Sequence, residues 1–377
     1  MMRLPRCAAV LRGPVLAVWL AGVVLGLGAS SAIAAPGQTQ ATDTLESLPA
    51  DSLYAIRTPD ASLLDDPFVR ETGKKGLDHL YNMEFEAART AFNQIDARYP
   101  DHPVGPFLKG LNIWWKILLD LPDTEHDEAF YDQMNEVIDR CNEILDEHPD
   151  HFDATFFKGA ALGFRGRLRS NRHSWIKAAY DGKRAIGYVR DIAQRAPENN
   201  DYVFGKGMYD YYAAIIPDEY PVSKTVMWLM PDGNKERGLS LIQRAAERGW
   251  YIQTEAAYFL TQIYYLYEQD FAKAREYVTW LRRQHPNNSY FHVLEGRVYG
   301  HWGRWDQTTR IFQEVVDRHE AGQTGYNEHM AQVAHFYLAR ARLYGNSYDQ
   351  ALVHLAELER LTTGDPHAAE FRVVGYL

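Results

Sequence analysis

Residues 255–288 read EAAYFLTQIYYLYEQDFAKAREYVTWLRRQHPNN, and residues 289–322 read SYFHVLEGRVYGHWGRWDQTTRIFQEVVDRHEAG. Aligned without a gap, each 34-residue stretch has an aromatic residue at position 17 and a small residue at position 20. A third copy, residues 332–365, follows after a nine-residue insertion. The three pairs are Phe271 with Ala274, Trp305 with Thr308, and Tyr348 with Ala351. This period and this pairing are typical of stacked helix pairs.

The apolar spacing is helical over most of the chain outside these copies as well. Leu77, Leu80 and Tyr81 share one helix face, and a second helix with Phe92 on its apolar face stops before Pro100. The same order of helix, turn, helix and proline recurs further along. We expect helix pairs at 107–121 with 131–148, 154–168 with 175–195, and 200–216 with 235–248. Alternation at period two is absent over any useful length, so we expect essentially no sheet.

Four units carry further small, aromatic and proline residues at shared positions. They are Tyr265, Phe271, Ala274 and Pro286 in 255–288; Gly296, Tyr299, Gly303, Trp305 and Phe312 in 289–322; Ala339, Tyr348 and Ala351 in 332–365; and Gly76, Phe85, Ala88, Phe92 and Pro100 in 69–102. With these residues the chain resembles the tetratricopeptide-repeat family. The resemblance implies an all-α fold, a right-handed α-solenoid of antiparallel helix pairs over residues 65–377. It also implies a non-catalytic adaptor without a cofactor, which binds a protein or peptide in a concave groove.

Alignment of the repeats assigns the family's groove positions to residues of the three C-terminal units. The positions are Phe259, Ile263 and Tyr267; Tyr290, Arg297 and His301; and Phe336, Arg340 and Tyr344. We interpret Phe259 and Ile263 as core residues and the other seven as candidate partner-binding residues. Aromatic side chains give large contact area, and arginine binds carboxylates with two parallel hydrogen bonds. The expected ligand is therefore an extended segment with apolar side chains and an acidic group.

The first 34 residues have the three parts of a secretory signal peptide. Arg3, Arg6 and Arg12 precede an apolar run over 14–29, and small residues at Ala32 and Ala34 suit a signal peptidase. The competing interpretation is an uncleaved anchor, but the run is short for a bilayer. We predict cleavage after residue 34, a flexible linker over 35–64, and export to the periplasm or cell envelope.

The charge balance excludes two classes of partner. The chain has a net charge of −10 at pH 7, and loss of the three leader arginines makes it −13. Nucleic acids and anionic membrane surfaces both require a basic footprint. No second apolar stretch is long enough to span a bilayer after signal cleavage. Once Cys7 leaves with the signal, Cys141 is the only cysteine, and its apolar helical neighbours indicate a buried thiol.

Two further segments support a second hypothesis. Arg165, Arg167, Arg169 and Arg172 cluster within eight residues, and arginine suits anionic groups. The segment 216–234 is a long, apolar, proline-rich insertion that could be a lid or a structural plug. Together they could form a pocket for a small anionic or glycan ligand. The alternatives are that the arginines pair with neighbouring acidic side chains and that the insertion is buried.

The search for catalytic motifs is negative. The sequence lacks a zinc-protease HExxH, a CxxC, a phosphate-binding glycine loop and a GxSxG. His148 and His151 with two aspartates straddle Pro149 and punctuate a repeat, so we predict no metal site. An enzyme without a recognisable motif remains a third hypothesis. The apolar tail 369–377 is either a cap on the last helix pair or a docking segment.

Overall fold

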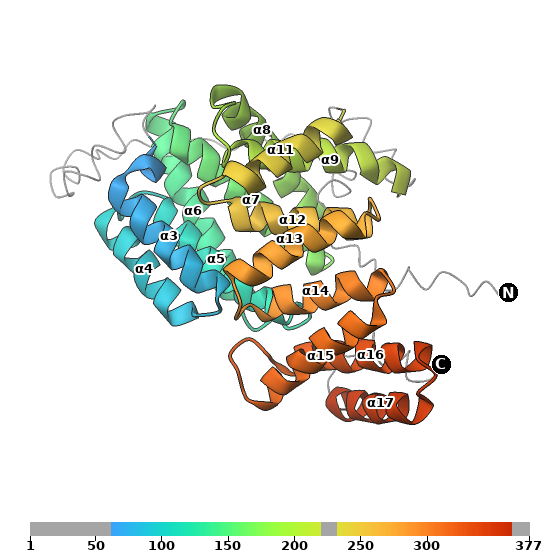
Figure 1. The fold of residues 1–377 in the computed structure, drawn as a ribbon. Helices are drawn as coiled ribbons and strands as arrows, with labels where there is room; N and C mark the ends of the chain where they lie inside the picture. The colour runs from blue at the N-terminus through green and yellow to red at the C-terminus, as the bar shows by residue number, and fades with distance from the viewer. Residues whose placement is uncertain (1–61, 220–231, 364–377) are drawn as a thin grey trace.

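The structure is a computed structural model, and it describes residues 62–219 and 232–363. These residues form fourteen α-helices and one short 3-10 helix, η3 (Leu63–Asp65), and they contain no strand (Figure 1). Consecutive helices pack against each other along the chain. The fold is therefore an all-α solenoid, which confirms the predicted class.

The helices form seven successive pairs. The pairs are α3 (Pro67–Tyr81) with α4 (Phe85–Arg98), α5 (Val104–Leu119) with α6 (Asp127–Glu147), α7 (Phe152–Asn171) with α8 (Trp175–Arg195), α9 (Val203–Glu219) with α11 (Lys235–Arg248), α12 (Gln253–Leu266) with α13 (Phe271–Gln284), α14 (Ser289–His301) with α15 (Trp305–Glu320), and α16 (Glu328–Tyr344) with α17 (Tyr348–Thr362). Each pair lies next to the following one, and the predicted helix ends agree with the observed ends to within a few residues.

The turn inside five of these pairs has one shared geometry. A residue with left-handed backbone lies two positions before the first residue of the second helix. These residues are Met83 (φ 65°), His173 (φ 56°), Gln269 (φ 54°), Gly303 (φ 74°) and Asn346 (φ 56°). Left-handed backbone is uncommon for residues other than glycine. The recurrence shows that the α7/α8 pair belongs to the same repeat, although its sequence resembles the other units only in helix length and proline placement.

The aligned aromatic and small residues have fixed positions in the pairs. Phe85, Phe271, Trp305 and Tyr348 are each the first residue of a second helix. The small residues three positions later are all fully buried. The glycines at position 8 leave room for a phenyl ring from the second helix. A Cβ on Gly76 or Gly296 would lie within 2.6 Å of Phe92 or Phe312.

Proline ends four of the second helices in the same way. The residue before each proline has φ near −130° and ψ between 63° and 79°, as at Tyr99, His148, Ala196 and His285. Proline disfavours helical backbone at the residue that precedes it. The helix must therefore stop there, which sets the length of the unit.

The solenoid closes on itself because its first helix returns to the fifth and sixth pairs. The Tyr81 hydroxyl on α3 donates to Glu255 Oε1 on α12 at 3.4 Å, and Asn288 Nδ2 donates to the Tyr81 carbonyl at 2.8 Å. One continuous apolar core joins α3 to α16. The space between the first helices of the pairs, which we call the central channel, is therefore filled with side chains over much of its length. It does not form an open groove. Helix α15 and the last pair, α16 with α17, extend below this closed part (Figure 1).

Several predicted segments lie wholly or partly outside the described residues. These are the signal peptide, most of the 35–64 linker, the centre of the 216–234 insertion, and the 369–377 tail. The end of the predicted linker is described and is structured. Leu63 in η3 is buried, and its backbone N–H donates to Asp153 Oδ2 at 2.7 Å.

Candidate functional site

The seven predicted partner-binding residues lie on the inner helices of the last three pairs. We call this set the C-terminal inner face: Tyr267, Tyr290, Arg297, His301, Phe336, Arg340 and Tyr344. His301 and Tyr344 are exposed, Phe336 is buried, and the other four are half-buried. Phe259 and Ile263 are buried in the core, which confirms their predicted role.

Aromatic rings hold the cationic part of this face in place. The Arg340 guanidinium carbon lies 5.5–5.7 Å from the ring centres of Trp305, Phe336 and Tyr337. The ring of Tyr344 stacks on Trp305 with 4.5 Å between centroids. Cations are attracted to aromatic faces at such distances. The contacts therefore fix the guanidinium while leaving its hydrogen-bond donors for other acceptors.

His301 lies beside the same buried tyrosine as Arg340. Its imidazole centre is 6.5 Å from the ring of Tyr337 and 5.3 Å from that of Tyr265. Burial raises the pKa of Tyr337, and the positive charges of Arg297 and Arg340 oppose that rise. Two guanidiniums and an imidazole from α14 and α16 therefore converge on one buried hydroxyl. Burial and the charges of Arg340 and Arg297 lower the pKa of His301, so the positive charge here comes from the two guanidiniums, within a chain that is acidic overall.

Tyr267 and Tyr290 belong to a different environment. The Tyr290 hydroxyl lies 3.2 Å from the hydroxyl of Tyr258, and its ring is 6.1 Å from Trp115. The ring of Tyr267 is 5.9 Å from that of Tyr212. These two predicted groove residues thus form the boundary between the C-terminal inner face and the filled channel.

The four clustered arginines of α7 are divided between two faces of the helix. Asp181 is fully buried and accepts hydrogen bonds from Arg165 at 2.7 and 2.9 Å and from Arg169 at 2.5 Å. Arg172 binds Asp127 and the carbonyls of residues 121 and 123. These three arginines pair with acidic side chains, as one of the two interpretations expected. Arg167 points the other way, into the interior.

An internal cavity of about 210 Å³ lies beside Arg167. Helices α3, α5, α7, α8, α9 and α12 supply its walls, and η3 contributes Leu64 at one end. The pocket expected from the sequence lay between the arginine cluster and the 216–234 insertion, whereas this cavity forms between side chains that are distant along the chain. Sequence reasoning identified Arg167 only as a member of the cluster and did not separate it from the other three arginines.

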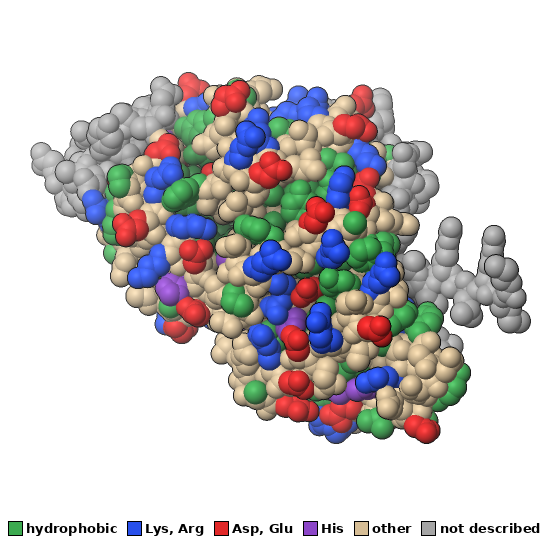
Figure 2. Space-filling view, viewed as in Figure 1, with side chains coloured by type: hydrophobic (Ala, Val, Ile, Leu, Met, Phe, Trp, Pro, Cys, Tyr) green, Lys and Arg blue, Asp and Glu red, His purple; other side chains and the backbone are tan. Residues whose placement is uncertain are grey.

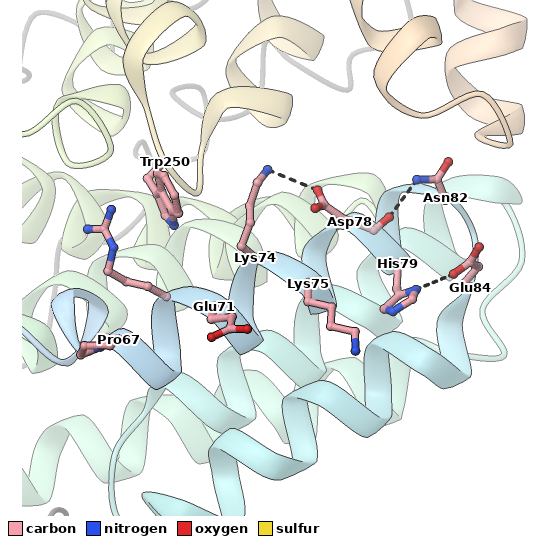
Figure 3. A pocket seen from close by; sticks show the side chains of 10 residues that line it. Pro67, Glu71, Lys74, Lys75, Asp78, His79, Asn82, Glu84 and Trp250 are labelled. Atoms are coloured by element: carbon pink, nitrogen blue, oxygen red, sulfur yellow. Dashed lines mark hydrogen bonds and ion pairs between the residues drawn. The ribbon is translucent and has the colours of Figure 1, made fainter.

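The outer face of α3 has a broad surface groove with charged walls (Figure 3). Lys74 pairs with Asp78 at 3.2 Å, and His79 contacts Glu84. The Arg70 guanidinium lies 4.4 Å from the ring of Trp250, which comes from the α11–α12 loop. Acidic and basic side chains are also intermixed across the face in Figure 2. The local pairing of charge makes this groove an ordinary solvated surface.

The comparisons and the described residues supply no catalytic assignment. The sequence matches no protein-family model and no curated protein sequence. Within 62–219 and 232–363, no group of three metal-ligating side chains is close enough to hold an ion. No helix in those ranges has the length and apolarity needed to cross a membrane. Cys141 is buried, as predicted, and burial raises the pKa of its thiol.

Proposed function

We propose that this protein is a non-catalytic scaffold that binds an acidic segment of a partner protein on the C-terminal inner face. The observation that carries the proposal is the convergence of Arg340 and His301 on Tyr337, with exposed Tyr344 beside them. A fixed guanidinium surrounded by aromatic rings suits a carboxylate flanked by apolar side chains.

The repeat pattern supports the same function. The shared turns, the buried small residues and the proline-ended helices agree with the resemblance to tetratricopeptide repeats, whose inner helices bind peptides or partner helices. We propose that the chain is an exported member of this family and acts in the periplasm or at the cell envelope. The leader-like residues 1–34 support this location.

The closed channel restricts where a partner segment can bind. Across α3, α5 and α12 the inner surface is occupied by Tyr81, Trp115 and Tyr258. This packing leaves the inner-face residues of α14 and α16 for a partner segment. An extended segment that follows α14 and α16 would meet His301, Arg340 and Tyr344 in turn.

A peptide selection tests the proposal directly. We expect peptides selected on the full chain to be enriched in Asp or Glu next to apolar residues. Arg340→Ala should weaken binding of a selected peptide at least tenfold in fluorescence anisotropy, because it removes a charged hydrogen bond. Arg310→Ala is the matched control, since Arg310 is an exposed arginine on α15, and it should bind normally.

The ionic strength gives an independent check. The affinity of an acidic peptide should fall as salt rises, because exposed charges are screened. Selected peptides without acidic residues, or equal affinity for the Arg340→Ala variant and the native protein, would contradict the proposal.

A further inference from the structure

The internal cavity has walls that are almost entirely apolar. Its lining includes Leu77, Val104, Phe107, Leu111, Phe156 and Phe204. An engineered apolar cavity of roughly 150 Å³ is large enough to bind benzene. With about 210 Å³, this cavity can accept a somewhat larger apolar group.

One end of the cavity has a buried guanidinium that lacks a carboxylate partner. Arg167 is only 4% exposed, and its Nη2 donates to the Tyr258 hydroxyl at 3.3 Å. Its guanidinium carbon lies 4.8 Å from the ring of Trp114 and 5.2 Å from that of Phe259. Its Nε–H has no acceptor, and no carboxylate in the described part of the chain forms an ion pair with it. A buried cation with an unused donor is costly unless an acceptor is supplied.

A second unused donor lines the same cavity. The Tyr212 side chain is 2% exposed, and its hydroxyl has no hydrogen-bond partner among the described residues. Burial raises the pKa of this hydroxyl, and the positive charge of Arg167 opposes that rise. The Arg167 Nε–H and the Tyr212 hydroxyl are thus two donors in the lining of one cavity that have no acceptor among the described residues.

Glu255 lines the cavity, but its carboxylate is engaged elsewhere. Glu255 Oε1 accepts hydrogen bonds from Trp115 Nε1 at 3.1 Å and from the Tyr81 hydroxyl at 3.4 Å. These donors belong to α5 and α3, at the contact that closes the solenoid. Burial raises the pKa of Glu255, which disfavours its ionised form, although the charge of Arg167 opposes this. Glu255 therefore offsets part of the Arg167 charge, but it does not accept from Arg167 Nε, whose N–H stays without an acceptor among the described residues.

We propose that the cavity binds a small carboxylic acid with an apolar body. The ligand's carboxylate accepts from Arg167 Nε and the Tyr212 hydroxyl, and its apolar body lies among the leucine, valine and phenylalanine side chains of the walls. Charge-assisted bonds to arginine are among the strongest hydrogen bonds in proteins, and an apolar environment strengthens them further. This site is separate from the C-terminal inner face and does not depend on partner binding there.

Titration calorimetry with defined probes tests the site on the full chain. We expect octanoate to bind at one site per chain and 1-octanol, which has the same apolar body without the charge, to bind at least tenfold more weakly. A comparison of octanoate with the aromatic acid 3-phenylpropionate shows whether the apolar part of the ligand is an alkyl chain or an aryl group. Tighter binding of octanoate assigns an alkyl chain, and tighter binding of 3-phenylpropionate assigns an aryl group.

Two variants locate the carboxylate. Arg167→Met retains the apolar stem and should weaken octanoate at least tenfold, while Tyr212→Phe removes one hydroxyl and should weaken it severalfold. Arg169→Met makes the same chemical change on the outer face of α7 and keeps the Arg165–Asp181 pair, so its affinity should be unchanged. Tyr212→Phe is nearly isosteric, and it retains the test if Arg167→Met does not fold.

Three results would overturn the inference. The first is that neither acid binds the native protein, in which case ordered water satisfies the two donors. The second is equal affinity for octanoate and 1-octanol. The third is unchanged octanoate affinity in folded Arg167→Met or, where that variant does not fold, in Tyr212→Phe.

Discussion

The closed part of the solenoid and its last helix pair use the same repeat but expose their inner helices differently. In the closed part, Trp115 on α5 is fully buried and touches rings from α3, α12 and α14. On α16, by contrast, Tyr344 is 60% exposed. The difference arises because α3 returns to face α12 and α14, whereas α16 is contacted from α5 at its N-cap, where Asn327 donates to the Leu119 carbonyl, and Tyr344 lies at its other end. A repeat thus determines the helix pair, and the closure determines whether its inner face is core or surface.

Closure also explains why the two regions have different polar groups. Inside the closed part, polar side chains such as Glu255 and Asn288 are buried and bind partners from distant helices. At the C-terminal inner face, Arg340 lies against aromatic rings of its own and the preceding pair. The first arrangement stabilises the fold, and the second is available for recognition.

The largest loss of stability is expected from a substitution that removes a large side chain at the centre of the closed part. Trp115→Ala removes a fully buried indole and the hydrogen bond to Glu255, so it should lower the free energy of unfolding by about 3–5 kcal/mol. Urea unfolding measures the change. Tyr348→Ala, on exposed α17, is the control and should change stability by less than about 0.5 kcal/mol. Similar losses for both variants would remove the distinction between the two regions.

A smaller loss of stability is expected at acidic pH, through His285, whose ring packs against Tyr81 where the solenoid closes. Burial lowers the pKa of His285 to about 3, and the charge of Lys74 adds to this. The unfolded histidine titrates near 6.5, so below that pH the unfolded chain binds a proton that the folded chain excludes. Stability is therefore lost as pH falls from about 6.5 towards 3, by roughly 2 kcal/mol at pH 5 from this group.

His285→Phe tests this origin of acid sensitivity. The phenyl ring can keep the contacts with Tyr81 and Phe291, although the bond to Thr254 is lost. Urea unfolding at pH 8 and pH 5 should show a pH-dependent loss that is smaller than in the native protein by about 2 kcal/mol. An unchanged pH dependence would show that His285 does not stay neutral in the folded state.

The smallest effect is expected at the start of the described chain. The Tyr251 hydroxyl donates to the Leu64 carbonyl at 2.8 Å and ties η3 to the α11–α12 loop. Tyr251→Phe should therefore lower the free energy of unfolding by about 1 kcal/mol. It should also speed amide hydrogen exchange over residues 62–66. Tyr180→Phe, at an exposed tyrosine, is the control and should leave both measurements unchanged.

Sequence analysis predicted the helix pairs because their signals are local. The apolar period, the small residue behind an aromatic and the proline after a helix each act within one unit. The turn geometry at Met83, His173 and Gln269 was not predicted, since only Gly303 among the five left-handed residues is a glycine. Register placed both Phe259 and Tyr344 at groove positions, and the separate interpretation of Phe259 as a core residue is confirmed, whereas Tyr344 is exposed.

The separate roles of the α7 arginines could not be predicted in the same way. Arg165, Arg167 and Arg169 are two residues apart, and a helix turns about 200° over two residues. The packing of α7 between α8 and the helices that line the cavity decides which face of α7 contacts Asp181 and which face lines the cavity. The same holds for Glu255, whose donors are 140 and 174 residues away.

The sequence by itself determined that this chain forms stacked helix pairs, where each helix ends, and which small and aromatic residues pack within a pair. Only the tertiary structure decided that the solenoid closes, that an apolar cavity lies between its described inner helices, and that Arg167 Nε has no acceptor there. The physical reason is the distance along the sequence over which residues interact. Helix formation and pairing depend on neighbours within one repeat. Closure results from the small rotations between successive repeats, and it brings together residues that share no local pattern.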